Sequence, residues 1–260
     1  MKALHIAATG MRAQELNVEV ISNNVANMRT TGYKRQRADF QDLLYQNLRR
    51  MGTNTSATGT IVPTGVQIGS GVKTASTARI MTQGNLAESG KDLDVAVRGE
   101  GFFQIQMPDG TTAYTRDGSF ERDANGQLVT IDGYAVQPGI VLPQDARDVT
   151  ISADGQVQIV DAGGAIQQLG QLQLARFINK SGLEAIGDNL FLETESSGAA
   201  VVGTPGEDGF GDLMQKHLEM ANVEAVSEIS DLIAAQRAYE MNSRIIKAAD
   251  EMSATTSNIR

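Results

Sequence analysis

The residues that break helices are confined to the middle of this chain. All five prolines lie between Pro63 and Pro205, Gly10 is the only glycine in residues 1–31, and residues 212–260 contain neither glycine nor proline. Glycine and proline are the residues least compatible with a helix interior. Long helices are therefore expected only at the two ends. The glycines and prolines of the middle predict short elements joined by turns.

The N-terminal end carries one stripe of apolar residues. Its positions are alternately three and four residues apart, with a single polar member, along Leu4, Ala7, Met11, Gln14, Val18, Ile21, Val25 and Met28. This spacing places the side chains on one face of a helix and suits packing against a partner helix. Gly32 can adopt the left-handed conformation that ends helices, so we expect a helical segment over 1–32.

The C-terminal end carries two such tracks, offset by one residue. One follows Ile229, Leu232, Gln236, Tyr239, Ser243 and Ile246, and the other follows Ile245, Ala249, Met252, Thr256 and Ile259. We expect a helix within 212–260 that pairs with the N-terminal helix and, at about 40 residues or ~60 Å, also needs neighbouring subunits. The predicted assembly seam comprises Leu4, Met11, Val18, Ile21, Val25, Ile229, Leu232, Tyr239, Ile245, Ile246, Ala249, Met252 and Ile259.

Between the helical ends the apolar period changes to two. Leu93, Val95 and Val97 alternate with polar or small residues, and Phe103, Ile105 and Met107 do the same, while Asp-Gly or Asn-Gly pairs recur at 109–110, 117–118, 125–126, 132–133 and 154–155. Alternation with hairpin-turn dipeptides predicts an antiparallel β domain over 88–211. Residues 33–87 are expected to be a linker or extended segment that leads into it, with 46–71 rich in Thr, Ser and Gly. The predicted fold class is α+β, with a mainly β centre inserted between long terminal helices.

Composition narrows the function. The chain has 260 residues and a net charge of −9, with basic residues prevailing in 1–50 and acidic residues in the remainder. An acidic body argues against nucleic acid as a partner. The absence of cysteine excludes disulfides, thiolate catalysis and cysteine-ligated zinc. The apolar runs fall short of the roughly 18 residues that span a bilayer, and the start of the chain shows no cleavable secretory signal.

The strongest candidate for a metal site is a calcium-loop spacing. Glu121, Asp123, Asn125, Gly126 and Asp132 fall at positions 1, 3, 5, 6 and 12 of an EF-hand-like loop. The last position normally needs a bidentate Glu, and the flanks of such a loop should be helices rather than the strands expected here. The Asn-Gly pair is better explained as a tight hairpin turn, so we expect no metal.

Other catalytic arrangements are incomplete. Residues 99–101 lack the third glycine, the Lys-Ser/Thr pair and the helix of a phosphate loop. His5 and His217 are the only histidines, and each is expected alone in a helix. Asp92 and Asp94 could form a glycosidase pair, but no sugar-binding aromatic residues surround them. We therefore expect no catalytic residue, no cofactor and no enzymatic activity.

Several segments together resemble one known family. Residues 21–41, with their run of Asn residues and a Thr-Gly-Tyr-Lys sequence, resemble the N-terminal signature of the bacterial flagellar rod and hook family. Residues 93–105 and 114–136 look like its central β motifs, and residues 217–252 are similar to its C-terminal motif around Ala-Gln-Arg-Ala-Tyr. Length, and the linker-like stretch before Pro63, are closest to the distal-rod members. Tyr33 replaces a frequent Phe, and Met28-Arg29 replaces Val-Asn.

The resemblance implies a structural subunit of the flagellar distal rod. Such subunits polymerise into a helical tube that transmits torque and conducts exported subunits. The implied partners are further copies of the chain, proximal rod and hook subunits, P- and L-ring proteins, and the flagellar type III export apparatus. The implied location is the periplasmic rod of the basal body, reached without a cleaved signal peptide. Alternatives are a proximal rod or hook subunit, or a secreted calcium-binding β protein.

Overall fold

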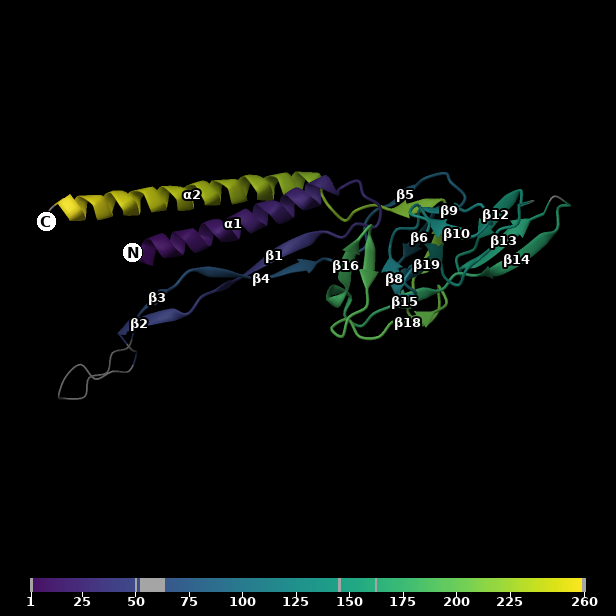
Figure 1. Cartoon of the computed structure of the whole chain (residues 1–260), viewed down its shortest axis with the longest axis horizontal. Helices are drawn as coiled ribbons and strands as arrows, with labels where there is room; N and C mark the ends of the chain where they lie inside the picture. The colour runs from purple at the N-terminus through teal and green to yellow at the C-terminus, as the bar shows by residue number, and fades with distance from the viewer. Residues whose placement is uncertain (1, 50, 52–63, 145, 162, 259–260) are drawn as a thin grey trace. The chain divides into compact units, whose positions relative to one another are not determined.

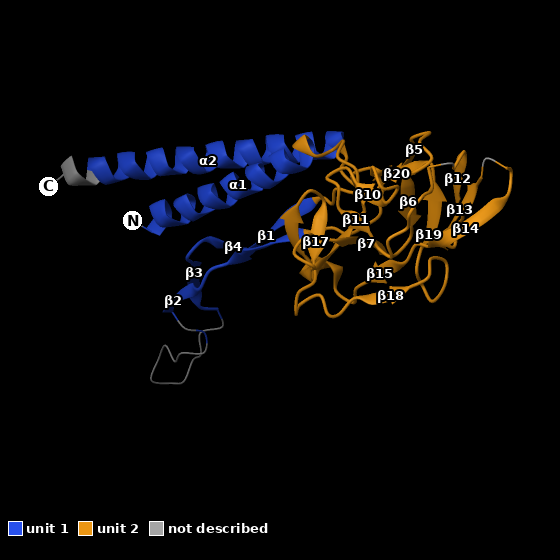
Figure 2. Cartoon of the chain, turned by 45° about the vertical axis from the view of Figure 1, so that its right-hand side comes forward, with its two compact units in different colours: residues 1–25, 36–78, 225–260 blue, residues 26–35, 79–224 orange. Residues whose placement is uncertain are grey.

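The computed structural model describes residues 2–49, 51, 64–144, 146–161 and 163–258 (Figure 1). Two long helices flank a series of strands: α1 spans Lys2–Ala26 and α2 spans Ala225–Asn258. The expected α+β class, with helical ends and an antiparallel β centre, is confirmed. The chain divides into two compact units, shown in Figure 2, of which unit 1 comprises residues 1–25, 36–78 and 225–260 and unit 2 comprises residues 26–35 and 79–224.

Unit 1 contains both helices and two β ribbons. The first ribbon pairs β1 (Gln36–Asp42) with β4 (Val72–Arg79), and the second pairs β2 (Tyr45–Arg49) with β3 (Val66–Gly69) in antiparallel register. The segment 46–71, which the composition predicts to be extended or flexible, thus contains β3 and most of β2, while residues 52–63 lie outside the described residues. The Val66-Gln67-Ile68 alternation is the sequence signal for β3.

The two helices are shorter than the ranges expected from composition. α1 ends at Ala26, a turn follows in which the Thr30 amide donates to the Asn27 carbonyl, and Gly32 adopts a φ of 68°. α2 begins at Ala225 rather than near 212, because the intervening residues form β19 (Asp212–Gln215) and β20 (His217–Glu219). His217 therefore lies in a strand and not in the expected helix. Freedom from glycine and proline permits a helix, but pairing with strands β6 and β5 prevails here.

Unit 2 is built on a nine-stranded antiparallel sheet. Its order is β16-β17-β8-β7-β11-β10-β9, and β15 pairs with both β7 and β18. A three-stranded sheet β12-β13-β14 and the pairs β19-β6 and β20-β5 complete the unit. The bounds are β5 Leu86–Glu88, β6 Val95–Arg98, β7 Phe102–Gln106, β8 Thr112–Thr115, β9 Phe120–Arg122, β10 Leu128–Thr130, β11 Ala135–Val136, β12 Asp148–Ile151, β13 Gln156–Val160, β14 Ile166–Gln171, β15 Leu174–Arg176, the 3-10 turn Lys180–Gly182, β16 Glu184–Gly187, β17 Leu190–Leu192 and β18 Val201–Gly203.

The period-two pattern places the core as expected. Val95, Val97, Phe103 and Ile105 are completely buried in one large apolar cluster, together with residues from β10, β13, β15 and β19. Because successive side chains of a strand point to opposite faces, Phe102 enters a second cluster beside its neighbour Phe103 in the first. In the second cluster, Phe102 makes edge-to-face contacts with Phe177 and Phe191.

Candidate assembly surface

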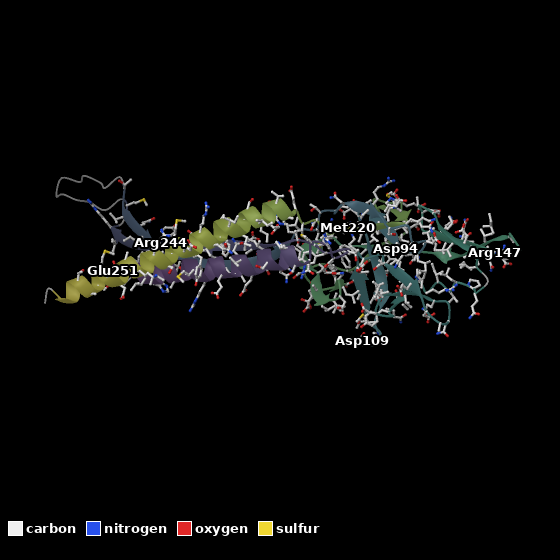
Figure 3. All side chains as sticks on the ribbon, turned by 90° about the horizontal axis from the view of Figure 1, so that it is seen from above. Asp94, Asp109, Arg147, Met220, Arg244 and Glu251 are labelled. Carbon is white, nitrogen blue, oxygen red and sulfur yellow. The ribbon has the colours of Figure 1, made fainter. Side chains whose placement is uncertain are left out.

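α1 and α2 lie side by side along unit 1 (Figures 1 and 3). Two contacts fix their antiparallel register: the Asn24 side chain donates to Glu228 Oε2 at 3.1 Å, and Gly10 lies directly against Asn242. The buried residues of α2 are Glu228, Ala235 and Ala249, which recur at multiples of seven. Small side chains at this spacing let the two helix backbones approach closely, as in a coiled-coil seam.

The predicted seam residues fall on different surfaces of these helices. Ile21 of α1 and Ala249 of α2 are buried, whereas Leu4, Met11, Val18, Val25, Leu232 and Ile246 are half-buried. Four others, Ile229, Tyr239, Ile245 and Met252, are exposed, with 62% of the Met252 surface accessible. Ile259 lies outside the described residues. The seam residues of α1 are thus buried or half-buried, whereas most of the described ones on α2 are exposed.

α2 carries a second apolar stripe opposite the face that packs on α1. At 100° per residue, its members occupy about half of the helix circumference, and they are Val226, Ile229, Ile233, Met241, Ile245 and Met252. The seam did not include Val226, Ile233 and Met241, although the steps from 226 to 229 to 233 follow helical spacing. Arg237, Arg244 and Glu251 lie on the same half of the helix, so this exposed face is mixed apolar and charged.

The ribbons of unit 1 also expose apolar side chains. Leu44, Tyr45, Leu48, Val66 and Ile68 are all exposed, and Leu44 presents 87% of its surface. A two-stranded ribbon is marginally stable in water unless it packs against something else. The sequence had suggested a linker here, so these residues were missed as part of an interaction surface.

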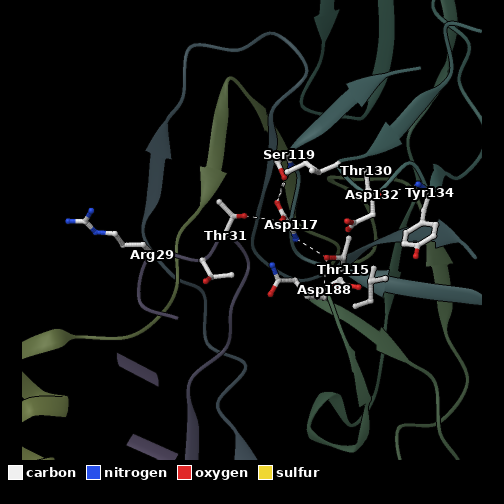
Figure 4. A pocket seen from close by; sticks show the side chains of 13 residues that line it. Arg29, Thr31, Thr115, Asp117, Ser119, Thr130, Asp132, Tyr134 and Asp188 are labelled. Carbon is white, nitrogen blue, oxygen red and sulfur yellow. Dashed lines mark hydrogen bonds between the residues drawn. The ribbon is translucent and has the colours of Figure 1, made fainter. Parts of the chain in front are cut away.

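A cavity of about 340 Å³ lies in unit 2 (Figure 4). Its hydroxyl and carboxylate groups bond to one another: Thr31 donates to Asp117 at 2.9 Å, Ser119 donates to Asp117 at 2.7 Å, and Thr115 donates to the Asn189 carbonyl at 2.8 Å. These bonds tie residue 31 to the hairpins of the sheet. These hydrogen bonds give the polar side chains that line the cavity a structural role.

The calcium-loop spacing forms a hairpin turn instead of a metal loop. The carboxylate of Asp123 accepts hydrogen bonds from the amides of Asn125 at 2.8 Å and Gln127 at 2.7 Å, and Gly126 adopts a φ of 86°. β9 and β10 pair directly across this turn. Throughout the described part of the chain, no group of three or more His, Cys, Asp or Glu side chains is placed to hold a metal ion.

Neither helix has the length and apolar content that crossing a bilayer requires, as judged over the described residues. His5 lies exposed on α1, and His217 contacts the Gln215 carbonyl through Nδ1 at 2.8 Å. The exposed apolar surfaces among the described residues of unit 1 are the second stripe of α2 and the ribbons.

Comparisons with known proteins agree on one class, the rod and hook proteins of the bacterial flagellum. Three family models match: flagella basal body rod protein over residues 4–34, flagellar hook protein FlgE/F/G D1 domain over 96–159, and flagellar basal body rod FlgEFG protein C-terminal over 214–259. A hook protein FlgE2 structure from Helicobacter pylori overlaps 72% of this chain and 43% of its own at 15% identity and a TM-score of 0.25, too low to carry an argument.

Relatives that match along nearly their full length narrow the class of rod and hook proteins to one family. The flagellar basal-body rod protein FlgG of Caulobacter vibrioides is 58% identical over 100% of both chains. The FlgG protein of Agrobacterium fabrum is 55% identical over 99% of this chain and 98% of its own. The chain therefore belongs to the FlgG family of flagellar basal-body rod proteins.

Proposed function

We propose that this protein is a structural subunit of the flagellar distal rod, which polymerises through its terminal helices into a helical tube. Membership of the FlgG family supports a rod subunit. The observation that carries the assembly mechanism is the second apolar stripe of α2, which the described residues of unit 1 leave exposed while the first stripe packs on α1.

Self-association follows from the physics of that stripe. Burying one Ile side chain contributes roughly 1.5–3 kcal/mol, and α2 presents Ile229, Ile233 and Ile245 together. A helix face that contacts a different face of the next copy makes a heterologous contact, and repetition of such a contact builds an open helical polymer. The predicted seam thus divides into an inner part that pairs α1 with α2 and an outer part that meets neighbouring copies.

The remaining partners belong to the same proposal. The ends of the tube meet proximal rod and hook subunits, and its outside passes the P- and L-ring proteins in the peptidoglycan and the outer membrane. The chain reaches this position through the flagellar type III export apparatus, without a cleaved signal peptide. Its role is mechanical, namely transmitting torque and conducting exported subunits, and it has no enzymatic activity.

Electron microscopy of concentrated protein in negative stain tests the assembly mechanism. We expect filaments or tubes that persist in a metal chelator, and polymers that dissolve in the chelator would support the calcium-binding alternative. A chain that stays monomeric at every concentration would contradict self-assembly.

The position of the protein within the basal body distinguishes a distal rod subunit from a proximal rod or hook subunit. Antibody labelling of purified basal bodies is expected at the rod segment next to the hook. Labelling at the base of the rod, or along the hook itself, would overturn the assignment to the distal rod.

A further inference from the structure

Segments from distant parts of the sequence converge on one buried carboxylate, that of Glu219 in β20. Lys34 Nζ lies 2.5 Å from Glu219 Oε1, and the Gly84 amide donates to the same oxygen at 2.9 Å. Arg116 Nε lies 3.3 Å from Oε2, as an ion pair without hydrogen-bond alignment. The Lys34 and Glu219 side chains are 1% and 0% exposed, and that of Arg116 is 5% exposed.

The cluster holds two cations against the Glu219 carboxylate, and Glu100 also favours the charged form of Arg116. Lys34 also donates to the Thr82 carbonyl at 2.8 Å, while Arg116 donates to the Gly101 carbonyl at 2.8 Å and the Gly99 carbonyl at 2.6 Å. Burial lowers the pKa of both Lys34 and Arg116, and the Glu219 carboxylate opposes that shift in each. Glu219 is therefore the group that makes burial of both cations tolerable.

Three residues after Glu219, Asn222 fastens the same segments. Its Oδ1 accepts from the Arg35 amide at 2.7 Å, and its Nδ2 donates to the Ile80 carbonyl at 2.8 Å. The Ile80 amide in turn donates to the Arg35 carbonyl at 2.8 Å, and the Gly32 amide donates to the Glu219 carbonyl at 2.8 Å. Residues 31–35, 80–84 and 219–222 are consequently bonded to one another in every pairing.

We infer that these three segments dock within unit 2 as one cooperative lock, with Glu219 as the shared anion, so that none of them closes stably without the other two. If 219–222 is absent from its place, two buried cations face each other unpaired, which is strongly unfavourable. If 31–35 is absent, Asn222 and Glu219 lose partners that water does not replace in the buried site. Glu219 follows Lys34 by 185 positions, so the early segment cannot finish docking until the chain is nearly complete.

Hydrogen exchange of the full chain in its native state measures this cooperativity. The probes are the amides of Gly32 and Arg35 in the first segment and of Gly84 in the second, and the acceptors of all three lie in the third segment. In the unsubstituted protein the three should exchange with the same opening equilibrium, as members of one unit do. Glu219→Gln should speed the exchange of all three by roughly a hundredfold or more, because both buried cations lose the one carboxylate that contacts them.

Charge balance predicts an ordering among variants. Lys34→Met leaves Glu219 paired with Arg116, so its effect should be smaller, roughly tenfold. In the Lys34→Met background, Glu219→Gln should speed amide exchange by a much smaller factor than it does in the unsubstituted protein. Only one cation then lacks the Glu219 charge. Lys216→Met is the matched control, since Lys216 forms an exposed ion pair with Asp92 away from the two buried cations, and it should leave all three probes unchanged.

Two outcomes would overturn the lock. Faster exchange confined to Gly84 in Glu219→Gln, with Arg35 unchanged, would mean that the segments dock independently. Additive effects of Lys34→Met and Glu219→Gln would mean that the charges are not shared. If Glu219→Gln is not recovered folded, Lys34→Met alone decides the first question through the Arg35 and Gly84 amides.

Discussion

Asn24 and Gln36 are joined by two hydrogen bonds between a side-chain amide and a backbone. Asn24 Nδ2 donates to the Gln36 carbonyl at 2.8 Å, and Asn24 Oδ1 accepts from the Gln36 amide at 2.9 Å. The side chain thus imitates one rung of a β ladder and holds the start of β1 beside the end of α1. Since Asn24 also donates to Glu228, one buried amide connects α1, β1 and α2 within unit 1.

Asn24→Asp should therefore destabilise unit 1. A carboxylate at this position faces the Gln36 carbonyl and the Glu228 carboxylate with no proton to donate, and a buried group left unsatisfied costs about 1–3 kcal/mol. The measurement is urea unfolding followed by the helical far-UV signal. Ser22→Asp, exposed on the same helix, is the matched control and should lower the free energy of unfolding far less. Equal losses in both variants would contradict a specific role for Asn24.

Ile245→Asp and Ala249→Asp should have different effects although they lie one turn apart on α2. Ile245 is about half exposed and belongs to the outer stripe, so Ile245→Asp should block polymerisation and motility while the monomer keeps its helix pair. Ala249 is buried, and an aspartate there should also reduce monomer helicity. Glu251→Lys, exposed on α2, should be milder than either. Normal swimming by Ile245→Asp would show that the outer stripe does not mediate assembly.

Unit 2 should lose stability in acid through its turn aspartates. The Gln127 amide, followed by the Asn125 side chain, holds the pKa of Asp123 below its ordinary value of 3.8. The unfolded chain consequently binds protons more readily than the folded one, so this stabilisation is complete above about pH 4 and is lost as the pH falls through the lowered pKa. Asp123→Asn should flatten the decline of melting temperature between pH 5 and pH 2. Asp132→Asn, in a neighbouring turn, controls for loss of a charge, and identical slopes in all three proteins would refute the assignment.

Gly110 in the β7–β8 hairpin turn and Gly118 in the connection from β8 to β9 should differ sharply in their tolerance of alanine. A Cβ at Gly118 would overlap the Val95 carbonyl oxygen, whereas a Cβ at Gly110 meets nothing within 4 Å and incurs only the strain of its positive φ. Gly110→Ala should cost about 1–2 kcal/mol, and Gly118→Ala about 3 kcal/mol or more because backbone must move. Chemical denaturation of both variants checks this order, and a Gly118→Ala protein as stable as Gly110→Ala would contradict it.

The strands of unit 2 were predictable because their signal is local. Val95, Val97, Phe103 and Ile105 alternate with residues that face elsewhere, and the structure confirms their burial. The start of α2 was not predictable in the same way. Residues 212–219 lack helix breakers, and only pairing with β6 and β5, more than a hundred positions earlier, makes them strands.

The assembly surface was predictable in part. Helical spacing identifies apolar residues on α2, but both tracks predicted from the sequence have steps of three and four, so spacing alone does not say which residues meet α1. The division of Ile246 from Ile245 rests on the register fixed by Asn24 with Glu228. The sequence around Lys34 does not predict the ion cluster, because within its own segment Lys34 looks like one of several surface cations.

The division of the chain into units has a mechanical consequence. The backbone passes from one unit to the other after Val25, Arg35, Ala78 and Glu224. Two domains joined by a single covalent tether can swivel about it, and the whole load then falls on that tether. With four backbone crossings, a force applied between the two units is shared by four peptide segments. Because the β unit is inserted between the helices, cleavage at any one crossing leaves the two units covalently joined through the other three.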